Sequence, residues 1–339
     1  MPATPAAPSW RTLLDHARWS PSPHNIQPWC LRVVSDREAE LCYEPRRLLP
    51  DTDPTGRFMM SGFGSFVECL AVSASPEGWA LDVEYDGRSF DFHATTVQPL
   101  ARLRLSPASR PPEFDRALLR RRHTSRLAFD GRPAPPALVA ELRAIAAAFG
   151  HDFQATDDPA TVKWVLELNR DTLFYDLAAD LNRNELSLWI RYSEVDERAR
   201  RDGLSARCLD VPGWMVSLLF RHPRWFRTPV FYAIARRYYL GKTRGTRTVA
   251  WLRGPFESMP DAFQAGRMLA RMWLAMTRAG VVLHPFGSII TNPTAHAIMR
   301  ERLVLDESRQ PTWLLFRMGY SAPPPQSLRR EVDELLVEA

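Results

Sequence analysis

Two side-chain amides stand close together in a proline-rich segment near the start of the chain. Asn25 and Gln27 lie within the run Pro21-Ser22-Pro23-His24-Asn25-Ile26-Gln27-Pro28-Trp29. An amide carries two donors and an acceptor, so this pair can meet alternating C=O and N–H groups on the edge of a flat heterocyclic ring. Ser22 adds a hydroxyl, and the prolines restrict the backbone, which places these groups in advance. The segment therefore predicts a ring-binding loop.

A second cluster, further along the chain, suits a phosphate group. Arg122 and Arg126 flank His123, Thr124 and Ser125. Two guanidinium groups and the Thr124 hydroxyl can converge on one oxyanion, because guanidinium matches phosphate geometry with paired hydrogen bonds. The alternative is that Arg122 and Arg126 form a solvated helix end. His24 has two interpretations as well, as a neighbour of the bound ring or as a structural hydrogen-bonding residue.

Together these segments resemble the FMN-dependent nitroreductase family. Residues 21–29 resemble its PSxxNxQPW signature, and residues 122–130 resemble the Arg-His-Ser/Thr-x-Arg/Lys motif that holds the FMN phosphate. The resemblance implies an α+β nitroreductase-like fold, an FMN cofactor and NAD(P)H as electron donor. It assigns FMN binding in this part of the chain to Pro21, Ser22, Pro23, His24, Asn25, Gln27, Arg122, His123, Thr124 and Arg126.

Two later segments extend the resemblance. Residues 280–288 resemble the family's strand on which backbone N–H groups just after a proline reach flavin N5. The resemblance assigns this region of the site to Pro285, Phe286, Gly287 and Ser288, with Phe286 and Gly287 acting through their backbone. Gly319-Tyr320, followed by Arg329-Arg330, resembles the C-terminal segment whose arginine closes on the phosphate, and either arginine fits. No catalytic side chain and no metal site is expected, because the flavin carries the chemistry.

The order of the motifs departs from the common family pattern. Ordinary members are homodimers that begin with the phosphate motif, and each flavin site takes one motif from each subunit. Here the ring-side motif comes first, which resembles a single-chain branch with two nitroreductase-like halves and an inserted lid. We therefore expect an internal pseudo-dimer with one FMN, residues 1–107 forming the first half and 108–339 the second. The chain is then a monomer or pairs further as a homodimer.

The elements that carry these motifs are predicted from apolar spacing and from proline and glycine positions. The segment 56–75 is apolar nearly all round, which indicates a deeply buried helix. Helices are expected at 10–19, 56–75, 113–120, 135–149, 162–182 and 265–279. Strands are expected at 29–34, 40–43, 81–85, 89–93, 101–105 and 313–318. Each half then combines helices with a small sheet.

A segment at about 186–256 lies outside the resemblance. From Val211 to Phe256 the chain has no Asp or Glu, and arginines alternate with aromatic residues. We expect a helical lid over the site whose arginines extend to solvent. Peripheral membrane contact through 211–256 is the main alternative, since basic and aromatic residues suit a bilayer surface. Stacking on nucleic acid is the least favoured, and no nucleic-acid partner is expected.

The composition sets the broad class. The 339 residues are 45% hydrophobic and 24% charged, which supports a packed core. The four cysteines form no CxxC pair, which favours a reduced, cytoplasmic compartment, and we expect neither a signal peptide nor a membrane span. The net charge of +5 suits a phosphate-bearing cofactor, a nucleic acid or a membrane surface equally well.

Three functions follow. The first is an oxidoreductase that passes hydride from NAD(P)H through flavin N5 to a small oxidised substrate of the nitroaromatic or quinone kind. The second is an FMN storage protein whose lid blocks the site. The third is a specialised flavin-dependent biosynthetic dehydrogenase whose basic cap holds a bulky anionic substrate. The sequence favours the first.

Overall fold

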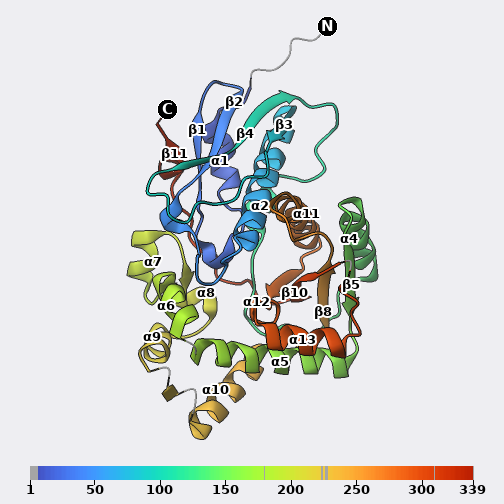
Figure 1. The fold of residues 1–339 in the computed structure, drawn as a ribbon. Helices are drawn as coiled ribbons and strands as arrows, with labels where there is room; N and C mark the ends of the chain where they lie inside the picture. The colour runs from blue at the N-terminus through green and yellow to red at the C-terminus, as the bar shows by residue number, and fades with distance from the viewer. Residues whose placement is uncertain (1–6, 179, 223, 226–227, 309, 339) are drawn as a thin grey trace.

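The chain folds into two main β-sheets, the first mixed and the second antiparallel, joined by a pair of central helices (Figure 1). The computed structural model describes residues 7–178, 180–222, 224–225, 228–308 and 310–338. The first sheet has the order β11-β1-β2-β4-β3, and the second has the order β5-β8-β10-β9. The expected α+β class is confirmed. A small parallel pair of two-residue strands forms a third sheet.

The strands of the first sheet come from the first third of the chain and from its end. Its members are Trp29–Val33 (β1), Glu38–Tyr43 (β2), Trp79–Glu84 (β3), Gln98–Pro107 (β4) and Leu336–Val337 (β11). β11 is parallel to β1 and pairs Leu336 with Leu31, so the C-terminal segment crosses from the second sheet to the edge of the first. Figure 1 shows this crossing, with the C-terminus beside β1.

The second sheet is built entirely from later residues. Its strands are Asp152–Thr156 (β5), Thr248–Arg253 (β8), Val282–Pro285 (β9) and Thr312–Gly319 (β10). β8 was expected to belong to the insertion that ends near residue 256, and this boundary is wrong. Its run of Val, Ala, Trp and Leu is buried between β5 and β10, as suits a central strand. We therefore call residues 186–247 the lid.

The two central helices, α2 (Arg57–Ala74) and α11 (Met259–Arg278), are held close by glycine. A Cβ atom on Gly64 would lie 1.9 Å from the Phe263 carbonyl oxygen, and one on Gly266 would lie 1.9 Å from that of Ser61. Ser65 Oγ donates a hydrogen bond of 2.9 Å to the Gly266 carbonyl across this contact. One hydrophobic core runs through both helices and both sheets.

The remaining helices surround this core and form the lid. Around the core lie Trp10–Ala17 (α1), Ala117–Arg121 (α3), Pro136–Ala148 (α4), Pro159–Ala178 (α5), Gly287–Thr291 (α12) and Pro293–Arg302 (α13). The lid contains Asp180–Leu188 (α6), Ile190–Arg191 (β6), Glu194–Arg200 (α7), Leu204–Ser205 (β7), Ala206–Leu209 (α8), Gly213–Arg221 (α9) and Pro229–Lys242 (α10). Short 3-10 turns occupy Pro23–Asn25, Pro45–Arg47, Ser75–Glu77 and Val332–Leu335.

One expected strand does not form in the structure. The strand expected at 89–93 does not form, because the backbone of this segment bonds to side chains instead of a neighbouring strand. Asp91 N donates to the Tyr43 hydroxyl, and Phe90 packs edge-on against the Tyr43 ring. The helix expected at 162–182 corresponds to α5 and the start of α6, and residue 179 between them lies outside the described residues.

Candidate functional site

The ring-side loop has an unusual backbone. Between the end of α1 and the start of β1, three residues adopt left-handed conformations: His24 (φ 49°), Asn25 (φ 56°) and Gln27 (φ 49°). Such conformations cost energy in residues other than glycine, and they concentrate where a functional site holds the chain in place. Ser22 contributes to the loop itself, since its Oγ accepts a hydrogen bond of 3.0 Å from Gln27 N.

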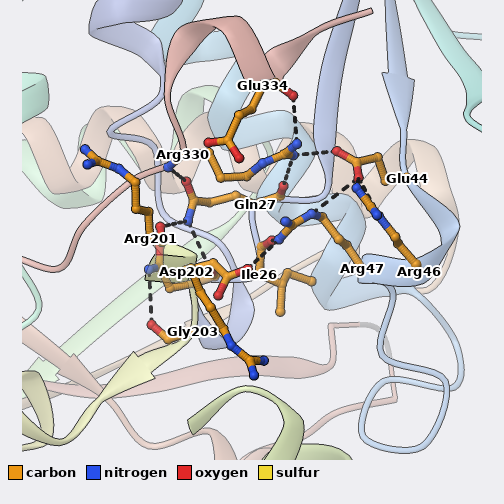
Figure 2. Close-up of polar contacts among 12 residues, drawn as sticks. Ile26, Gln27, Glu44, Arg46, Arg47, Arg201, Asp202, Gly203, Arg330 and Glu334 are labelled. Atoms are coloured by element: carbon orange, nitrogen blue, oxygen red, sulfur yellow. Dashed lines mark hydrogen bonds and ion pairs between the residues drawn. The ribbon is translucent and has the colours of Figure 1, made fainter. Parts of the chain in front are cut away.

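Gln27 is fully buried and its amide is bonded within the protein. Its Nε2 donates to the carbonyls of Arg201 (3.0 Å) and Asn25 (3.2 Å), and its Oε1 accepts from Arg330 N at 2.8 Å. Figure 2 shows these contacts, which join the ring-side loop, the lid and the C-terminal segment. In this conformation the Gln27 side chain therefore positions the loop.

Asn25 keeps one group unused. Its Nδ2 donates to the carbonyls of Gly203 (3.1 Å) and Leu328 (3.2 Å). Its Oδ1 is buried and has no hydrogen-bond partner among the described residues. A buried acceptor without a partner is costly, so this oxygen is the atom of the loop best placed to receive a donor from a ligand.

Ion pairs behind the loop hold the lid against it. Asp202 accepts from Arg47 at 2.8 Å and from Arg191 at 2.5 Å, and all three side chains are largely buried. Arg330 pairs with Glu44 at 2.5 Å and also donates to the Gln27 carbonyl (Figure 2). Arg330 is thus neutralised by a carboxylate, which makes it a structural residue.

Arg122 and Arg329 present the opposite case, because neither has an acidic partner among the described residues. Arg122 is 7% exposed, donates to the Trp19 carbonyl at 3.0 Å and lies over the Trp273 ring. Arg329 is 5% exposed and bonds to Ser327 Oγ at 2.6 Å. The Nε atom of each is buried without a partner.

Both guanidinium groups contact Trp19, since its carbonyl accepts from Arg122 and Arg329 lies over its ring, 5.8 Å from the centroid. Burial lowers the pKa of Arg122 to about 10. Burial, and next the charge of Arg122, lower the pKa of Arg329 to about 9. Two buried cations that repel each other and meet no carboxylate among the described residues are suited to holding an anion. Of the two C-terminal arginines that the sequence offered, Arg329 therefore lies with the phosphate motif and Arg330 does not.

The rest of the phosphate motif runs along strand β9. Thr124 forms a parallel bridge with Leu283, and Ser125 N donates to the Leu283 carbonyl at 3.0 Å. His123 Nδ1 lies 2.6 Å from the Arg121 carbonyl. The structure thus brings the segment 122–126 beside the segment 280–288, two regions that are far apart in the sequence.

Four further groups meet beneath the lid. Arg126 donates to the Cys208 carbonyl at 3.5 Å. Burial, and next the charge of Arg126, lower the pKa of His24 to about 4. Burial and the charges of Arg317 and Arg126 hold the pKa of His284 well below its usual range. Both imidazoles are consequently neutral near pH 7, and the charge of this cluster is positive.

Arg317 is the residue of this cluster that sequence reasoning missed. It is fully buried on β10 and donates to His284 Nδ1 (3.3 Å), Thr246 Oγ1 (3.0 Å) and the Leu127 carbonyl (2.9 Å). Burial lowers its pKa to about 10. The available signal was an arginine in the middle of the apolar strand Thr312–Gly319, where an unpaired charge is rare.

The segment after Pro285 contributes mainly backbone. Phe286 is buried, and its N–H donates to the Leu315 carbonyl at 2.8 Å, so that N–H belongs to the sheet. Gly287 follows at the start of α12, is exposed, and has open space where a side chain would be. Ser288 is the next residue of α12. In the part of the chain that the structure describes, no group of three or more His, Cys, Asp or Glu residues could hold a metal ion.

Comparison with known proteins gives sequence relatives that include proteins named as NAD(P)H nitroreductases. The chain is 25% identical over 321 residues to the probable NAD(P)H nitroreductase PigM of a Serratia species, covering 86% of this chain and 83% of that protein. It is 34% identical over 152 residues to a putative NAD(P)H nitroreductase of Mycobacterium tuberculosis, covering 43% of this chain and 41% of that one. No protein-family model matches the chain.

Solved structures give more distant similarities. The FMN-dependent nitroreductase NfnB of Mycobacterium smegmatis, in complex with NADPH, is 16% identical with a TM-score of 0.38, covering 64% of this chain and 94% of that one. A nitroreductase with bound FMN from Desulfitobacterium hafniense is 12% identical with a TM-score of 0.37, covering 62% and 91%.

The chain is thus an α+β protein with two main sheets. Its ring-side loop carries two amide side chains on left-handed backbone, and two buried arginines have no acidic partner among the described residues. Over most of its length the chain is similar to a protein named as a probable NAD(P)H nitroreductase.

Proposed function

We propose that this protein is an FMN-dependent oxidoreductase of the nitroreductase type, which passes hydride from NAD(P)H through flavin N5 to a small oxidised nitroaromatic or quinone-like acceptor. The observation that carries the proposal is the pair Arg122 and Arg329, two buried guanidinium groups with no acidic partner among the described residues. The names of the sequence relatives, NAD(P)H nitroreductases, support the same activity.

The residues present fit FMN at the phosphate end. A phosphate dianion would neutralise Arg122 and Arg329 together and accept hydrogen bonds from their unpartnered Nε atoms. Towards the ring, Asn25 Oδ1 is an unpartnered acceptor suited to an imide N–H. When bound, FMN supplies the hydride chemistry, and the protein supplies orientation and electrostatics.

The side chains beneath the lid set the charge at the ring end. Arg126 and Arg317 are cations there, while His24 and His284 are neutral near pH 7 because burial and these arginines lower their pKa. Preorganised positive charge in a buried site favours negative charge that develops on a ligand. We assign no side-chain acid or base to the reaction.

We also propose that the single chain is an internal pseudo-dimer that forms one flavin site, with residues 1–107 and 108–339 as its halves. The crossing of β11 to β1 supports this proposal, since a strand from the end of the second half completes the first sheet. The site groups support it as well, because Asn25 belongs to the first half while Arg122 and Arg329 belong to the second.

One observation favours a second candidate, an FMN storage protein. The lid carbonyls of Arg201 and Gly203 occupy the amide donors of Gln27 and Asn25. Asp202, between them, is locked by the ion pairs with Arg47 and Arg191. A lid held in this way would retain a bound flavin and obstruct a second substrate.

Anaerobic reduction distinguishes the two candidates. The protein is purified, loaded with FMN and mixed with NADH or NADPH under anaerobic conditions while the visible absorbance of the flavin is followed. Rapid bleaching that an added nitroaromatic or quinone reverses supports the oxidoreductase. A loaded protein that stays yellow with both donors supports storage. Protein that takes up no FMN would refute both candidates.

The Asp202→Asn variant sharpens this test. It removes the charge that holds the lid but keeps the size of the side chain, and Arg198→Gln, which removes half of an exposed ion pair with Glu194, is a matched control. For an oxidoreductase whose lid opens during turnover, we expect faster bleaching in Asp202→Asn than in the control. In a storage protein, we expect faster FMN release from Asp202→Asn.

A further inference from the structure

The outer face of helix α10 is apolar although it faces solvent. Val230 and Ile234 are 74% and 64% exposed, and Tyr238, one turn further, is 39% exposed. Their spacing of four residues places them in one row along the helix. A surface helix ordinarily turns charged or polar side chains to solvent and apolar ones to the core, so this row is reversed.

The opposite face of α10 already has its partner. Tyr232 and Tyr239 hydrogen-bond to Asp171 and Asn169, both on α5. Figure 1 shows α10 at the end of the molecule opposite the N-terminus, with α5 beside it. Since α10 docks on α5 through this inner face, the row of Val230, Ile234 and Tyr238 remains on the outside.

Basic residues accompany the apolar row. Arg237 on α10 is exposed, as are Arg221 and Arg224 just before the helix. None of these three arginines forms an ion pair within the described residues, and residues 211–256 contain no Asp or Glu. Trp225 is 39% exposed and packs against Phe231 in the first turn of α10. The surface thus combines aliphatic side chains, an aromatic anchor and unpaired positive charge.

We propose that the outer face of α10, together with Trp225, docks on the surface of an anionic lipid bilayer. Aliphatic side chains can enter the acyl boundary, tryptophan favours the headgroup level, and arginine pairs with anionic headgroups. The contact is peripheral, because the one described helix long and apolar enough to cross a membrane, residues 57–77, is mostly buried in the core.

The same features disfavour other occupants. A second copy of the chain related by a two-fold axis would bring identical patches together, so arginines would face arginines with no acidic residue to neutralise them. A nucleic acid would neutralise the arginines, but Val230 and Ile234 have no ring on which a base can stack. Only a surface that is both anionic and apolar matches the arginines and the apolar row together.

Co-sedimentation with vesicles tests the proposal on the full chain. The probes are vesicles of phosphatidylcholine alone and vesicles in which part of it is replaced by phosphatidylglycerol. We expect the protein to pellet with the anionic vesicles and to remain in the supernatant with the neutral ones. High salt should weaken binding, because each arginine near an anionic surface contributes about a fivefold change in affinity.

Matched variants separate docking from general charge attraction. Val230→Glu combined with Ile234→Glu should reduce binding by more than about tenfold, since it removes the apolar row and adds negative charge. Arg224→Gln combined with Arg237→Gln should also weaken it. Val195→Glu, 79% exposed on α7, and Arg143→Gln, exposed on α4, should bind as the wild type does. Thermal unfolding of each variant checks that it folds.

Three outcomes would overturn the proposal. The first is no pelleting, or equal pelleting with both kinds of vesicle. The second is anionic binding that the two glutamates on α10 leave unchanged. The third is a wild-type dimer in sedimentation equilibrium that Ile234→Glu converts to a monomer, which would assign the face to a second copy. The result is independent of flavin content, so it does not depend on the proposed activity.

Discussion

At the scale of single residues, the site is defined by which arginines have a carboxylate and which do not. Burying a charge is costly unless an opposite charge or strong hydrogen bonds compensate it. Arg330 meets this condition through Glu44, whereas Arg122 and Arg329 do not among the described residues. Two neighbouring arginines in the sequence, Arg329 and Arg330, thus have opposite roles that only the fold distinguishes.

This contrast predicts opposite effects of two similar substitutions. Arg329→Gln should lower FMN affinity by about ten- to a hundredfold, the value of one charge-assisted contact. It should leave the unliganded protein as stable as the wild type or more stable, because it removes repulsion with Arg122. Fluorescence titration of FMN and thermal unfolding measure the two effects.

Arg330→Gln is the comparison variant. It should lower the free energy of unfolding by roughly 1–3 kcal/mol, because Glu44 loses a buried partner. Its effect on FMN affinity should be smaller than that of Arg329→Gln. Equal losses of affinity in both variants, or destabilisation of the unliganded protein by Arg329→Gln, would contradict the assignment of the phosphate site.

His24 makes the free energy of unfolding depend on pH in the acidic range. Its pKa is about 4 in the fold and 6.5 as an ordinary histidine, so between these values the unfolded chain binds more protons. Stability therefore falls as the pH is lowered from 6.5 towards 4, by about 3 kcal/mol at most from this residue. His24→Asn, which tolerates the left-handed backbone, should reduce this fall.

Urea unfolding at several pH values between 4 and 7 measures this effect. The informative quantity is the difference between His24→Asn and the wild type, because other titrating groups contribute equally to both. Parallel stability curves for the two proteins would show that His24 is exposed to solvent protons in the folded state.

At the residue scale, some candidate site residues could be chosen from the sequence and others could not. The loop 21–29 and the segment 122–126 could be chosen as candidates because their residue types suit a ring edge and a phosphate, and their binding roles stay predictions. Arg317 could not, since its role arises from burial beside His284 and Leu127, which come from separate segments. Nor could the bonding of Gln27 to the lid, because a lid contact depends on how a long insertion folds back.

At the scale of elements, the central helix pair depends on two glycines. Gly64→Ala should lower the free energy of unfolding by about 3 kcal/mol, because the added methyl group would collide with the backbone of α11 at Phe263. Gly241→Ala is the control in a helix with nothing within 4 Å of the new Cβ, and it should stabilise by about 0.5–1 kcal/mol.

Urea unfolding of both variants checks this prediction. A small effect of Gly64→Ala would mean that α2 and α11 can separate without disturbing the core that joins the sheets. The pair was predicted only in part from the sequence. The buried helix at 56–75 followed from its apolar residues. The close contact with α11 did not, because the presence of a glycine does not show which segment packs against it.

The errors at this scale have physical causes. The segment 89–93 has the residue types of a strand, yet its backbone bonds to the Tyr43 hydroxyl, a contact that no local pattern encodes. Residues 248–253 were assigned to the insertion because the absence of acidic residues continues through them. These residues both lack acidic side chains, like the insertion, and have the apolar side chains of a buried strand. In the structure they form that strand.

At the scale of the whole molecule, the first sheet and the central helix pair each combine segments that are distant in the sequence. The first sheet receives β11 from the end of the chain, and α2 packs on α11 along the glycine contact. Arg18, which follows the end of α1, also pairs with Glu331 of the C-terminal segment. The first sheet therefore depends on residues from the far end of the chain for its edge and its packing.

A nick between the proposed halves tests whether they act as partners of a dimer. A protease site is inserted between Ser109 and Arg110, in an exposed connection after β4, and the loaded protein is cleaved. We expect the two fragments to co-elute in size-exclusion chromatography as one particle that keeps its FMN, because α2 with α11 and β1 with β11 hold them together. Separation under native conditions, or FMN retained by one fragment alone, would refute the shared site. Adding Gly64→Ala to the nicked protein should promote dissociation, since the fragments then lose the close helix contact while every site residue is unchanged.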